Sequence, residues 1–299
     1  MRYTLHPLNR GFTWRPACEP AVRNGAGLSP AQLEAFERDG CIGVQDVFDA
    51  AEVAAMLAAI DPLEAEAEAH LRTRPEGRIS ISRAGEITFR PHLVLQSPLL
   101  ARACRHPRLL ALCRDLVGPD VRLYWDQSVY KKPGMPEEFP WHQDNGYTFV
   151  EPQQYLTCWI ALTDATPDNG CPWVVPGLHR LGTLAHEWTT YGYRCLDGVE
   201  VEDAVPVPLR AGGVAVFSSL TPHRTGPNLT TATRKAYIVQ YAPEGATILR
   251  PDGTREPAMA AGRQFPVLRG GQPCDAIPDG AVAGDEIPGG AIPGSEEVA

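Results

Sequence analysis

The spacing of apolar residues changes along this chain, from a helical period in the first third to an alternating period after about residue 121. Side chains that share one face of an α-helix recur every three or four positions. One stripe follows this rule, with steps of three, one, three and three between Val53, Met56, Leu57, Ile60 and Leu63. The stripe predicts a helix that packs its apolar face into the core.

Capping residues mark where the expected helices begin and end. Ser29 begins a capping box ahead of one helix, and Gly40 is expected to end that helix. Asp49 is placed to cap the helix that carries the apolar stripe. Two further short helices are expected at roughly 98–105 and 107–117.

After residue 121 the chain reads as a series of short strands. Residues 121–131 are rich in β-branched and aromatic side chains. In residues 155–163 Trp159 lies opposite an apolar face formed by Leu156, Cys158, Ile160 and Leu162. Further strands are expected at 172–176, 213–218 and 234–242. This pattern predicts a mainly β fold with flanking helices, built as an antiparallel sandwich or barrel.

Composition separates the end of the chain from the rest. Residues 270–299 hold seven Gly, four Pro, six acidic residues and no basic residue. Such a segment buries too little apolar surface to offset its ordering entropy, so we expect a disordered tail. Residues 1–269 are expected to form one domain, with helices from about 29–118 packed on a β core of about 121–245.

Charge and hydropathy argue against two classes of partner. The net charge of −9 comes from 36 acidic and 27 basic residues, and six of the acids lie in the tail. No excess of positive charge is available to attract phosphates, so nucleic-acid binding is not expected. No apolar run is long enough for a membrane helix and the N-terminus has no secretory pattern, so we expect a cytoplasmic protein with reduced cysteines.

The segment Trp141-His142-Gln143-Asp144 is the sharpest candidate for chemistry. Residues two apart on a strand project from the same face, so His142 and Asp144 are expected to point together into a cavity. A histidine and a carboxylate are two thirds of the facial triad that binds Fe(II) and leaves positions open. The HxD pattern is common by chance, so it needs a third ligand.

His223 follows an apolar strand and supplies a candidate for that ligand. Arg234 comes eleven residues later and begins the next expected strand. An arginine buried inside a barrel needs an anionic partner, and its planar fork suits a carboxylate. The hydroxyl group of Thr225 is placed to bind the same carboxylate.

Together these residues resemble the phytanoyl-CoA dioxygenase family of Fe(II)/2-oxoglutarate-dependent oxygenases. The similarity covers about residues 30–245. It includes PHLVLQSP near 91–98, HPRLLALCRDLVGPDV at 106–121, CWIALTDATPDNGCPWVVPGLHR at 158–180 and PHRTGPNLTTATRKAYIVQY at 222–241. The resemblance implies a double-stranded β-helix, the jelly-roll or cupin-like core, which agrees with the predicted strands.

The resemblance also implies roles for individual residues and a set of cofactors. The iron ligands would be His142, Asp144 and His223, and the far carboxylate of 2-oxoglutarate would meet Arg234 and Thr225. Less certain cosubstrate contacts are Gln143 and Gln127. The cofactors implied are Fe(II), 2-oxoglutarate as cosubstrate, and molecular oxygen. Because Asp144 is present where related halogenases have a small residue, oxygen insertion is favoured over halogenation.

Aromatic residues near these positions are candidates for the substrate pocket. Trp141, Tyr147 and Phe149 flank the HxD segment, and Trp159 is expected either to line the cavity or to pack beneath helices. They hint at a mostly apolar or ring-bearing small-molecule substrate. Residues 181–208 read as an inserted loop over the cavity.

Three functions remain open at this point. The first is hydroxylation of an unactivated C–H bond, with conversion of 2-oxoglutarate to succinate. The second is another oxidative outcome at the same iron centre: desaturation, ring closure, epimerisation or dealkylation in natural-product biosynthesis. The third is a jelly-roll binding module without turnover, and the joint presence of His223, Thr225 and Arg234 argues against it.

Overall fold

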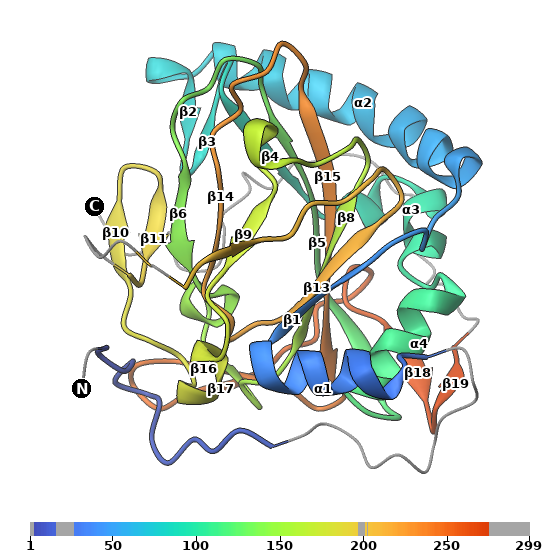
Figure 1. The fold of residues 1–299 in the computed structure, drawn as a ribbon, viewed down its shortest axis with the longest axis vertical. Helices are drawn as coiled ribbons and strands as arrows, with labels where there is room; N and C mark the ends of the chain where they lie inside the picture. Colours follow the sequence, from blue (N-terminus) through green and yellow to red (C-terminus); the bar gives the residue numbers. More distant parts are fainter. Residues whose placement is uncertain (1–2, 16–26, 197–200, 202, 275–299) are drawn as a thin grey trace.

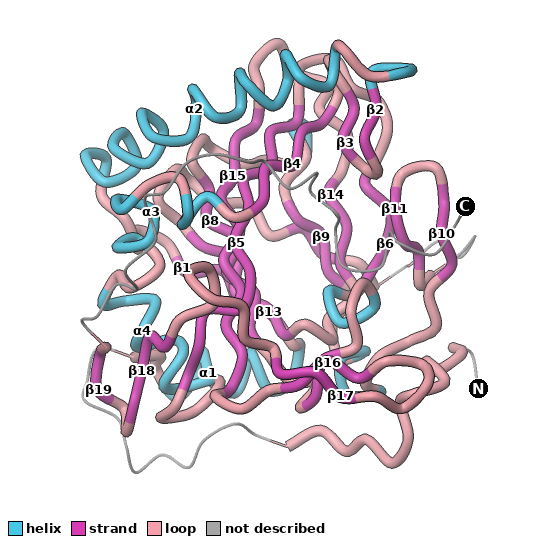
Figure 2. The backbone as a smooth tube through the Cα atoms, turned by 180° about the vertical axis from the view of Figure 1, so that it is seen from behind, coloured by secondary structure: helices cyan, strands magenta, loops and turns pink. Residues whose placement is uncertain are grey.

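A computed structural model describes residues 3–15, 27–196, 201 and 203–274. Two β-sheets face each other, and helices cover the outer side of the larger sheet (Figure 1). The same layers are visible from behind, where the helices lie beside the larger sheet and the smaller sheet lies apart from them (Figure 2). The candidate site lies between the two sheets.

The larger sheet is antiparallel and has ten strands. Its main path runs through β1 (Cys41–Val44), β13 (Val214–Ser218), β8 (Leu156–Ala161), β15 (Arg234–Pro243), β5 (Val121–Lys131), β4 (Ile87–Pro91), β3 (Ser82–Arg83) and β2 (Arg78–Ile79). Off this path, β18 (Pro266–Arg269) pairs with β5 and with β19 (Gln272–Pro273).

The smaller sheet carries most of the candidate chemistry. Its order is β12 (Val205–Pro206), β9 (Pro172–Val174), β14 (His223–Thr225) and β6 (Phe139–His142). Two further units are the hairpin of β10 (Glu187–Thr189) with β11 (Gly192–Arg194), and a small sheet of β17 (Arg255–Pro257), β16 (Thr247–Leu249) and β7 (Val150–Glu151). Two facing antiparallel sheets confirm the predicted mainly β fold.

Four α-helices occur in the described part of the chain. They are α1 (Pro30–Asp39), α2 (Ala50–Arg72), α3 (Pro98–Ala103) and α4 (Pro107–Leu116). Single 3-10 turns lie at Pro75–Gly77, Leu93–Leu95, Asp144–Gly146, Pro167–Asn169 and Leu178–Leu181. The predicted capping boxes are present at both Ser29 and Asp49. Of the predicted stripe, Val53, Met56 and Ile60 are buried, while Leu57 and Leu63 pack against the core.

Strand β8 shows how the sheet separates core from site. Cys158 and Ile160 are buried in the main core, which includes residues of the helices. Thr157 and Trp159 alternate with them and line a pocket on the other face. This alternation confirms the predicted division of the strand and gives Trp159 a place in the pocket wall.

Two expectations about chain organisation need correction. The first third contains four strands as well as helices, because β1 to β4 occupy stretches between residues 41 and 91. Residue 269 is not the end of regular structure, since β19 continues to Pro273 and pairs with β18. The remainder of the expected tail, from residue 275, lies outside the described residues. The described cysteines are all free thiols, and none of the described helices could cross a membrane.

Candidate functional site

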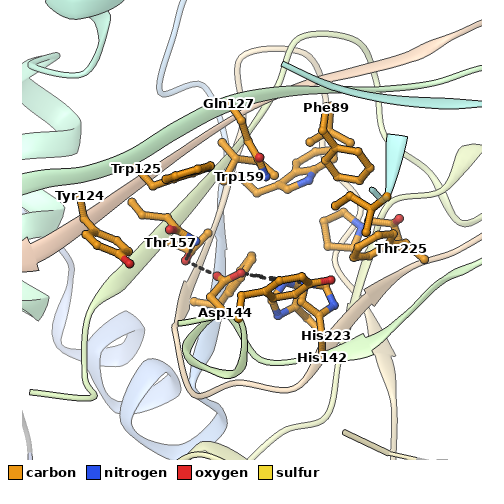
Figure 3. Close-up of a pocket in the computed structure, with 18 of the residues that line it drawn as sticks. Phe89, Tyr124, Trp125, Gln127, His142, Asp144, Thr157, Trp159, His223 and Thr225 are labelled. Atoms are coloured by element: carbon orange, nitrogen blue, oxygen red, sulfur yellow. Dashed lines mark hydrogen bonds and ion pairs between the residues drawn. The ribbon is translucent and has the colours of Figure 1, made fainter. Parts of the chain in front are cut away.

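Three side chains converge at one end of the smaller sheet. Ligand atoms of His142, Asp144 and His223 all lie within 4.8 Å of one another (Figure 3). Strands β6 and β14 bring the two histidines together, because His223 pairs directly with His142. A cluster of two imidazoles and one carboxylate is a donor set suited to Fe(II).

The HxD segment reaches this arrangement differently from the prediction. Strand β6 ends at His142, and Asp144 begins a 3-10 turn rather than continuing the strand. The amide of Tyr147 closes the turn by donating to the Asp144 carbonyl over 3.1 Å. The turn, and not a shared strand face, therefore directs the carboxylate toward the histidines.

Each candidate histidine ligand is held in one tautomer. His142 Nδ1 lies 2.8 Å from the Pro140 carbonyl oxygen, and His223 Nδ1 lies 3.0 Å from the Thr221 carbonyl oxygen. A carbonyl only accepts, so both Nδ1 atoms carry hydrogen and both Nε2 atoms are left as lone-pair donors. Burial lowers the pKa of His142 to about 3 and that of His223 to about 4, so both are neutral near pH 7.

The carboxylate of Asp144 has two distinct oxygens. Oδ1 lies 4.0 Å from His142 Nε2 and 3.8 Å from His223 Nε2. Oδ2 instead accepts a hydrogen bond from the Thr157 hydroxyl group. Burial raises the pKa of Asp144, while His142 and the Thr157 hydrogen bond oppose that rise.

The cluster opens into a pocket of about 100 Å³. Its wall comes from both sheets and is mostly aromatic and aliphatic, comprising Ile81, Ile87, Phe89, Tyr124, Trp125, Gln127, Val129, Phe139, His142, Asp144, Tyr147, Thr148, Tyr155, Thr157, Trp159, Pro172, Phe217, His223, Thr225, Ile238 and Gln240. Figure 3 shows Gln127 and Phe89 opposite the metal-ligand candidates, with Trp159 nearby. A pocket with one polar corner is a typical small-molecule site.

Arg234 lies beside this pocket with unused donors. Its side chain is 1% exposed, and its guanidinium carbon lies 5.1 Å from the centre of the Trp159 ring. Nη1 donates to the Val129 carbonyl over 3.1 Å, whereas Nε and Nη2 have no partner in the described part of the chain. Burial lowers its pKa only to about 10, so the group stays charged. A buried charge with two free donors fits a carboxylate.

Lys131 is a second buried cation that sequence reasoning missed. It lies opposite Arg234 in the register of β5 and β15, and it is fully buried. Its ammonium group donates to the carbonyls of Thr225 and Gly226. Burial, with Arg234 adding to it, lowers the Lys131 pKa to about 7. Lys131 therefore holds the backbone of Thr225, the residue predicted to contact the cosubstrate carboxylate.

Several predicted pocket residues line the pocket. Gln127, Tyr147, Trp159 and Thr225 are all part of its wall. The Tyr147 hydroxyl oxygen accepts a hydrogen bond from the Tyr193 amide over 3.3 Å, which links the pocket to β11.

Three other predicted residues do not line the pocket. The Gln143 amide donates to the carbonyls of Gly182 and Leu220 and accepts from the Leu184 amide, so it has no free group for a cosubstrate. Trp141 packs against Arg224 outside the pocket, and the guanidinium carbon of Arg224 lies 5.0 Å from the centre of the Trp141 ring. Phe149 stacks on the His6 ring at 5.0 Å. Trp141 precedes His142 on β6 and Gln143 follows it, so alternation places both on the face opposite His142, whereas Phe149 lies beyond the turn that begins at Asp144.

The structure adds a wall that the sequence did not indicate. Ile81, Ile87 and Phe89 come from β4 and the turn between β2 and β3, in a region expected to be helical or irregular. Trp125 and Thr157 also line the pocket. Trp125 and Thr157 each lie two residues from a predicted pocket candidate, Gln127 and Trp159, and sharing a strand face with it was the available signal.

The hairpin of β10 and β11 lies against the pocket. Its Gly192 is so close that a Cβ atom would lie 2.6 Å from Tyr147 Oη and 3.2 Å from Phe139 Cζ. The Thr190 carbonyl at its tip accepts hydrogen bonds from Arg78 and Arg83 over 2.9 and 2.6 Å. These contacts place part of the expected inserted loop 181–208 against Tyr147 and Phe139 of the pocket wall.

Comparison with known proteins agrees with this geometry. The family model described as phytanoyl-CoA dioxygenase (PhyH) matches residues 36–236. An ectoine dioxygenase of Sphingopyxis alaskensis is 33% identical over 179 residues, which are 56% of this chain and 56% of that relative.

Two solved structures share the fold. One is EctD from S. alaskensis with 2-oxoglutarate and 5-hydroxyectoine. Its TM-score is 0.62 and its identity is 26%, and the match covers 84% of this chain and 90% of the EctD chain. The other is the epimerase SnoN with Fe3+, alpha ketoglutarate and nogalamycin RO, which has a TM-score of 0.60 and 29% identity and covers 83% and 97%. With its cluster of His142, Asp144 and His223, its jelly-roll core and a family match over two thirds of its length, this chain belongs to the phytanoyl-CoA dioxygenase family.

Proposed function

We propose that this chain is a non-haem Fe(II)/2-oxoglutarate-dependent dioxygenase that hydroxylates an unactivated C–H bond of a small molecule. The observation that carries the proposal is one pocket with two complementary ends. One end has the cluster of His142, Asp144 and His223, and beside the other lies the buried Arg234 with two unused donors. A metal and a dicarboxylate satisfy both ends together.

Each residue has a defined part in this proposal. Nε2 of His142, Nε2 of His223 and Oδ1 of Asp144 would hold Fe(II), since these atoms face one another. Arg234 and Thr225 would hold the far carboxylate of 2-oxoglutarate, with Gln127 as a further candidate contact. When bound, iron, 2-oxoglutarate and oxygen supply the oxidising chemistry, which releases succinate and carbon dioxide.

The protein contributes positioning and exclusion of water. The aromatic and aliphatic wall would hold the substrate so that one C–H bond faces the metal side of the pocket. The β10–β11 hairpin covers this wall through Gly192 and its contacts with Tyr147 and Phe139. A shielded pocket protects a reactive site from competing reactions with solvent.

A second outcome at the same centre is supported by one comparison. SnoN, at 29% identity and a TM-score of 0.60, is described as an epimerase. Epimerisation, ring closure, desaturation and dealkylation would use the same ligands and the same cosubstrate contacts. Product analysis by mass spectrometry and NMR distinguishes them, since hydroxylation alone adds one oxygen atom. A binding module without turnover would not need the unpaired donors of Arg234 together with the cluster of His142, Asp144 and His223.

The test is anaerobic titration of the Fe(II)-loaded protein with 2-oxoglutarate, read by the visible charge-transfer band. The band is expected in the wild type, and Arg234→Ala should need far more cosubstrate. Truncating one partner of a buried charge pair costs about 2–5 kcal/mol, or roughly 30-fold or more in affinity. Arg224→Ala is the matched control, because Arg224 lies on β14 of the smaller sheet and packs on Trp141, which is not part of the pocket wall. Absence of the band despite bound iron would overturn the proposal.

A further inference from the structure

The small number of charged side chains in the pocket wall limits which substrate groups the pocket can bind. Apart from the predicted metal ligands, no charged side chain is part of the described wall. Asp144 faces the metal position, and Arg234 is assigned to the cosubstrate. An ionised substrate group inside this pocket would therefore lose its water without gaining a counter-charge, which is strongly unfavourable.

Several cations lie near the wall. Arg263 lies behind Trp125, with its guanidinium carbon 5.7 Å from the ring centre, and its Nη1 has no partner in the described part of the chain. The others donate to backbone carbonyls. Arg78 and Arg83 flank Ile81 in the sequence, and both donate to the Thr190 carbonyl. The Arg83 guanidinium also lies 4.0 Å from the centre of the Tyr191 ring. Lys131 is fully buried and donates to two backbone carbonyls. None of these side chains is part of the pocket wall.

The shape of the wall favours flat groups. The rings of Phe89 and Phe139 lie 5.3 Å apart, and those of Tyr124 and Tyr155 lie 5.2 Å apart at an interplanar angle of 62°. Trp125 adds a third aromatic surface. Aromatic side chains present large apolar faces and edges that contact rings well.

Polar contacts in the wall come from neutral groups. Tyr155 is 3% exposed and is part of the pocket wall. Burial raises the pKa of Tyr155, so its hydroxyl group stays uncharged. A phenol that keeps its proton pairs with a carbonyl, ether or hydroxyl oxygen of a ligand.

We propose that the part of the substrate that enters this pocket is an uncharged, ring-bearing group with neutral oxygen functions. It is thus distinct from the ionised end of an amino acid, a phosphonate or an acyl-CoA. This inference rests on the proposed function, because it assigns Asp144 to the metal and Arg234 to the cosubstrate.

A matched pair of probes tests the proposal. 1-Naphthalenesulfonamide and 1-naphthalenesulfonate have nearly the same shape, but only the second is charged at pH 7.5. Both would be titrated into Zn(II)-loaded protein saturated with 2-oxoglutarate, with quenching of tryptophan fluorescence as the readout, since Trp125 and Trp159 line the pocket. The neutral probe is expected to bind at least tenfold more tightly. Equal affinity, or tighter binding of the anion, would overturn the proposal.

A charge-insertion variant locates the binding. Phe89→Arg places a cation in the wall and should shift the preference toward the sulfonate by about tenfold. Leu229→Arg is the control, because Leu229 is 65% exposed and is not part of the wall. An equal shift in both variants would show that the probes bind elsewhere and would overturn the assignment. If Phe89→Arg does not fold, the wild-type comparison alone still decides the preference.

Succinate formation separates this inference from the proposed function. One outcome is that 2-oxoglutarate is consumed, but ectoine and methylphosphonate stimulate turnover better than neutral ring compounds do. That outcome would support the proposed function and overturn the inferred substrate class. If the neutral probe is preferred but no 2-oxoglutarate is bound or consumed, the pocket preference stands and the oxygenase assignment falls.

Discussion

The hydroxyl group of Thr157 donates a hydrogen bond of 2.5 Å to Oδ2 of Asp144. The same hydroxyl accepts from Gln240 Nε2 over 3.3 Å, so its single proton is directed to the carboxylate. Oδ1 is then the oxygen of Asp144 that remains for a metal, near both imidazoles. If Asp144 holds the metal as proposed, Thr157 is a positioning residue that favours ligation through one oxygen.

Thr157→Val removes this hydrogen bond and keeps the size of the side chain. Loss of a partner that orients a ligand typically lowers metal affinity about 10–100-fold. We expect a loss at the lower end of that range, measured by Co(II) titration and visible absorption of the intact protein. Thr157→Ser should retain most of the affinity, because it keeps the hydroxyl group. Equal Co(II) affinity in the wild type and Thr157→Val would assign Thr157 to the pocket wall alone.

Lys131 makes the stability of the cosubstrate-free protein depend on pH. Its pKa is about 7 when folded and about 10.4 when exposed, so between these values the unfolded chain binds more protons. The free energy of unfolding should therefore rise with pH in this window, by up to about 1.4 kcal/mol per pH unit. Urea unfolding at several pH values between 7 and 10 measures the slope.

Lys131→Met is the comparison for that slope. The variant lacks the titrating group, so its unfolding free energy should rise less steeply with pH than that of the wild type. Complete burial of Lys131 indicates that its ammonium group is desolvated. Equal slopes of unfolding free energy against pH in the wild type and Lys131→Met would contradict this.

Gly192 limits how closely the β10–β11 hairpin approaches the pocket. A methyl group at this position would contact Tyr147 and Phe139 at less than ordinary van der Waals distance, and the residue has φ +124°. Gly192→Ala should displace the hairpin tip and lower substrate-stimulated succinate formation, while the affinity for 2-oxoglutarate stays the same.

Gly253→Ala is the matched control for the hairpin. Gly253 also has a positive φ, +88°, but a Cβ atom there meets no other atom within 4 Å. Both variants carry backbone strain, and only Gly192→Ala should change turnover. A similar loss in both would attribute the effect to stability and not to the pocket.

Gln143 stabilises the loops behind the metal-ligand cluster. Gln143→Leu would leave the buried carbonyls of Gly182 and Leu220 and the amide of Leu184 without their partner. Each unsatisfied buried group costs about 1–3 kcal/mol, so a large drop in thermal midpoint is expected. If the variant instead keeps its midpoint and loses 2-oxoglutarate affinity, the predicted cosubstrate role of Gln143 is restored.

Local features of the sequence predicted most of the architecture. The boxes at Ser29 and Asp49 set the starts of α1 and α2, because a cap and its helix involve only neighbouring residues. Alternation placed Trp159 on the face opposite Cys158, since strand geometry repeats every two residues. The triad His142, Asp144 and His223 also came from the sequence, through spacing and family resemblance.

The pocket wall was decided by contacts between distant segments. The turn at Asp144 ends the strand period, so Asp144 and Phe149 could not be placed by alternation from His142. Phe89 reaches Phe139 only because β4 pairs with β5 in the larger sheet, while β6 lies in the facing one. Thr157 shares a strand face with Trp159, but its hydrogen bond to Asp144 depends on how the two sheets pack. The sequence determined the helices, the main strands after residue 121 and the ligand types. The tertiary structure decided strands β1 to β4 and the orientation of side chains, because both depend on pairings that no local pattern encodes.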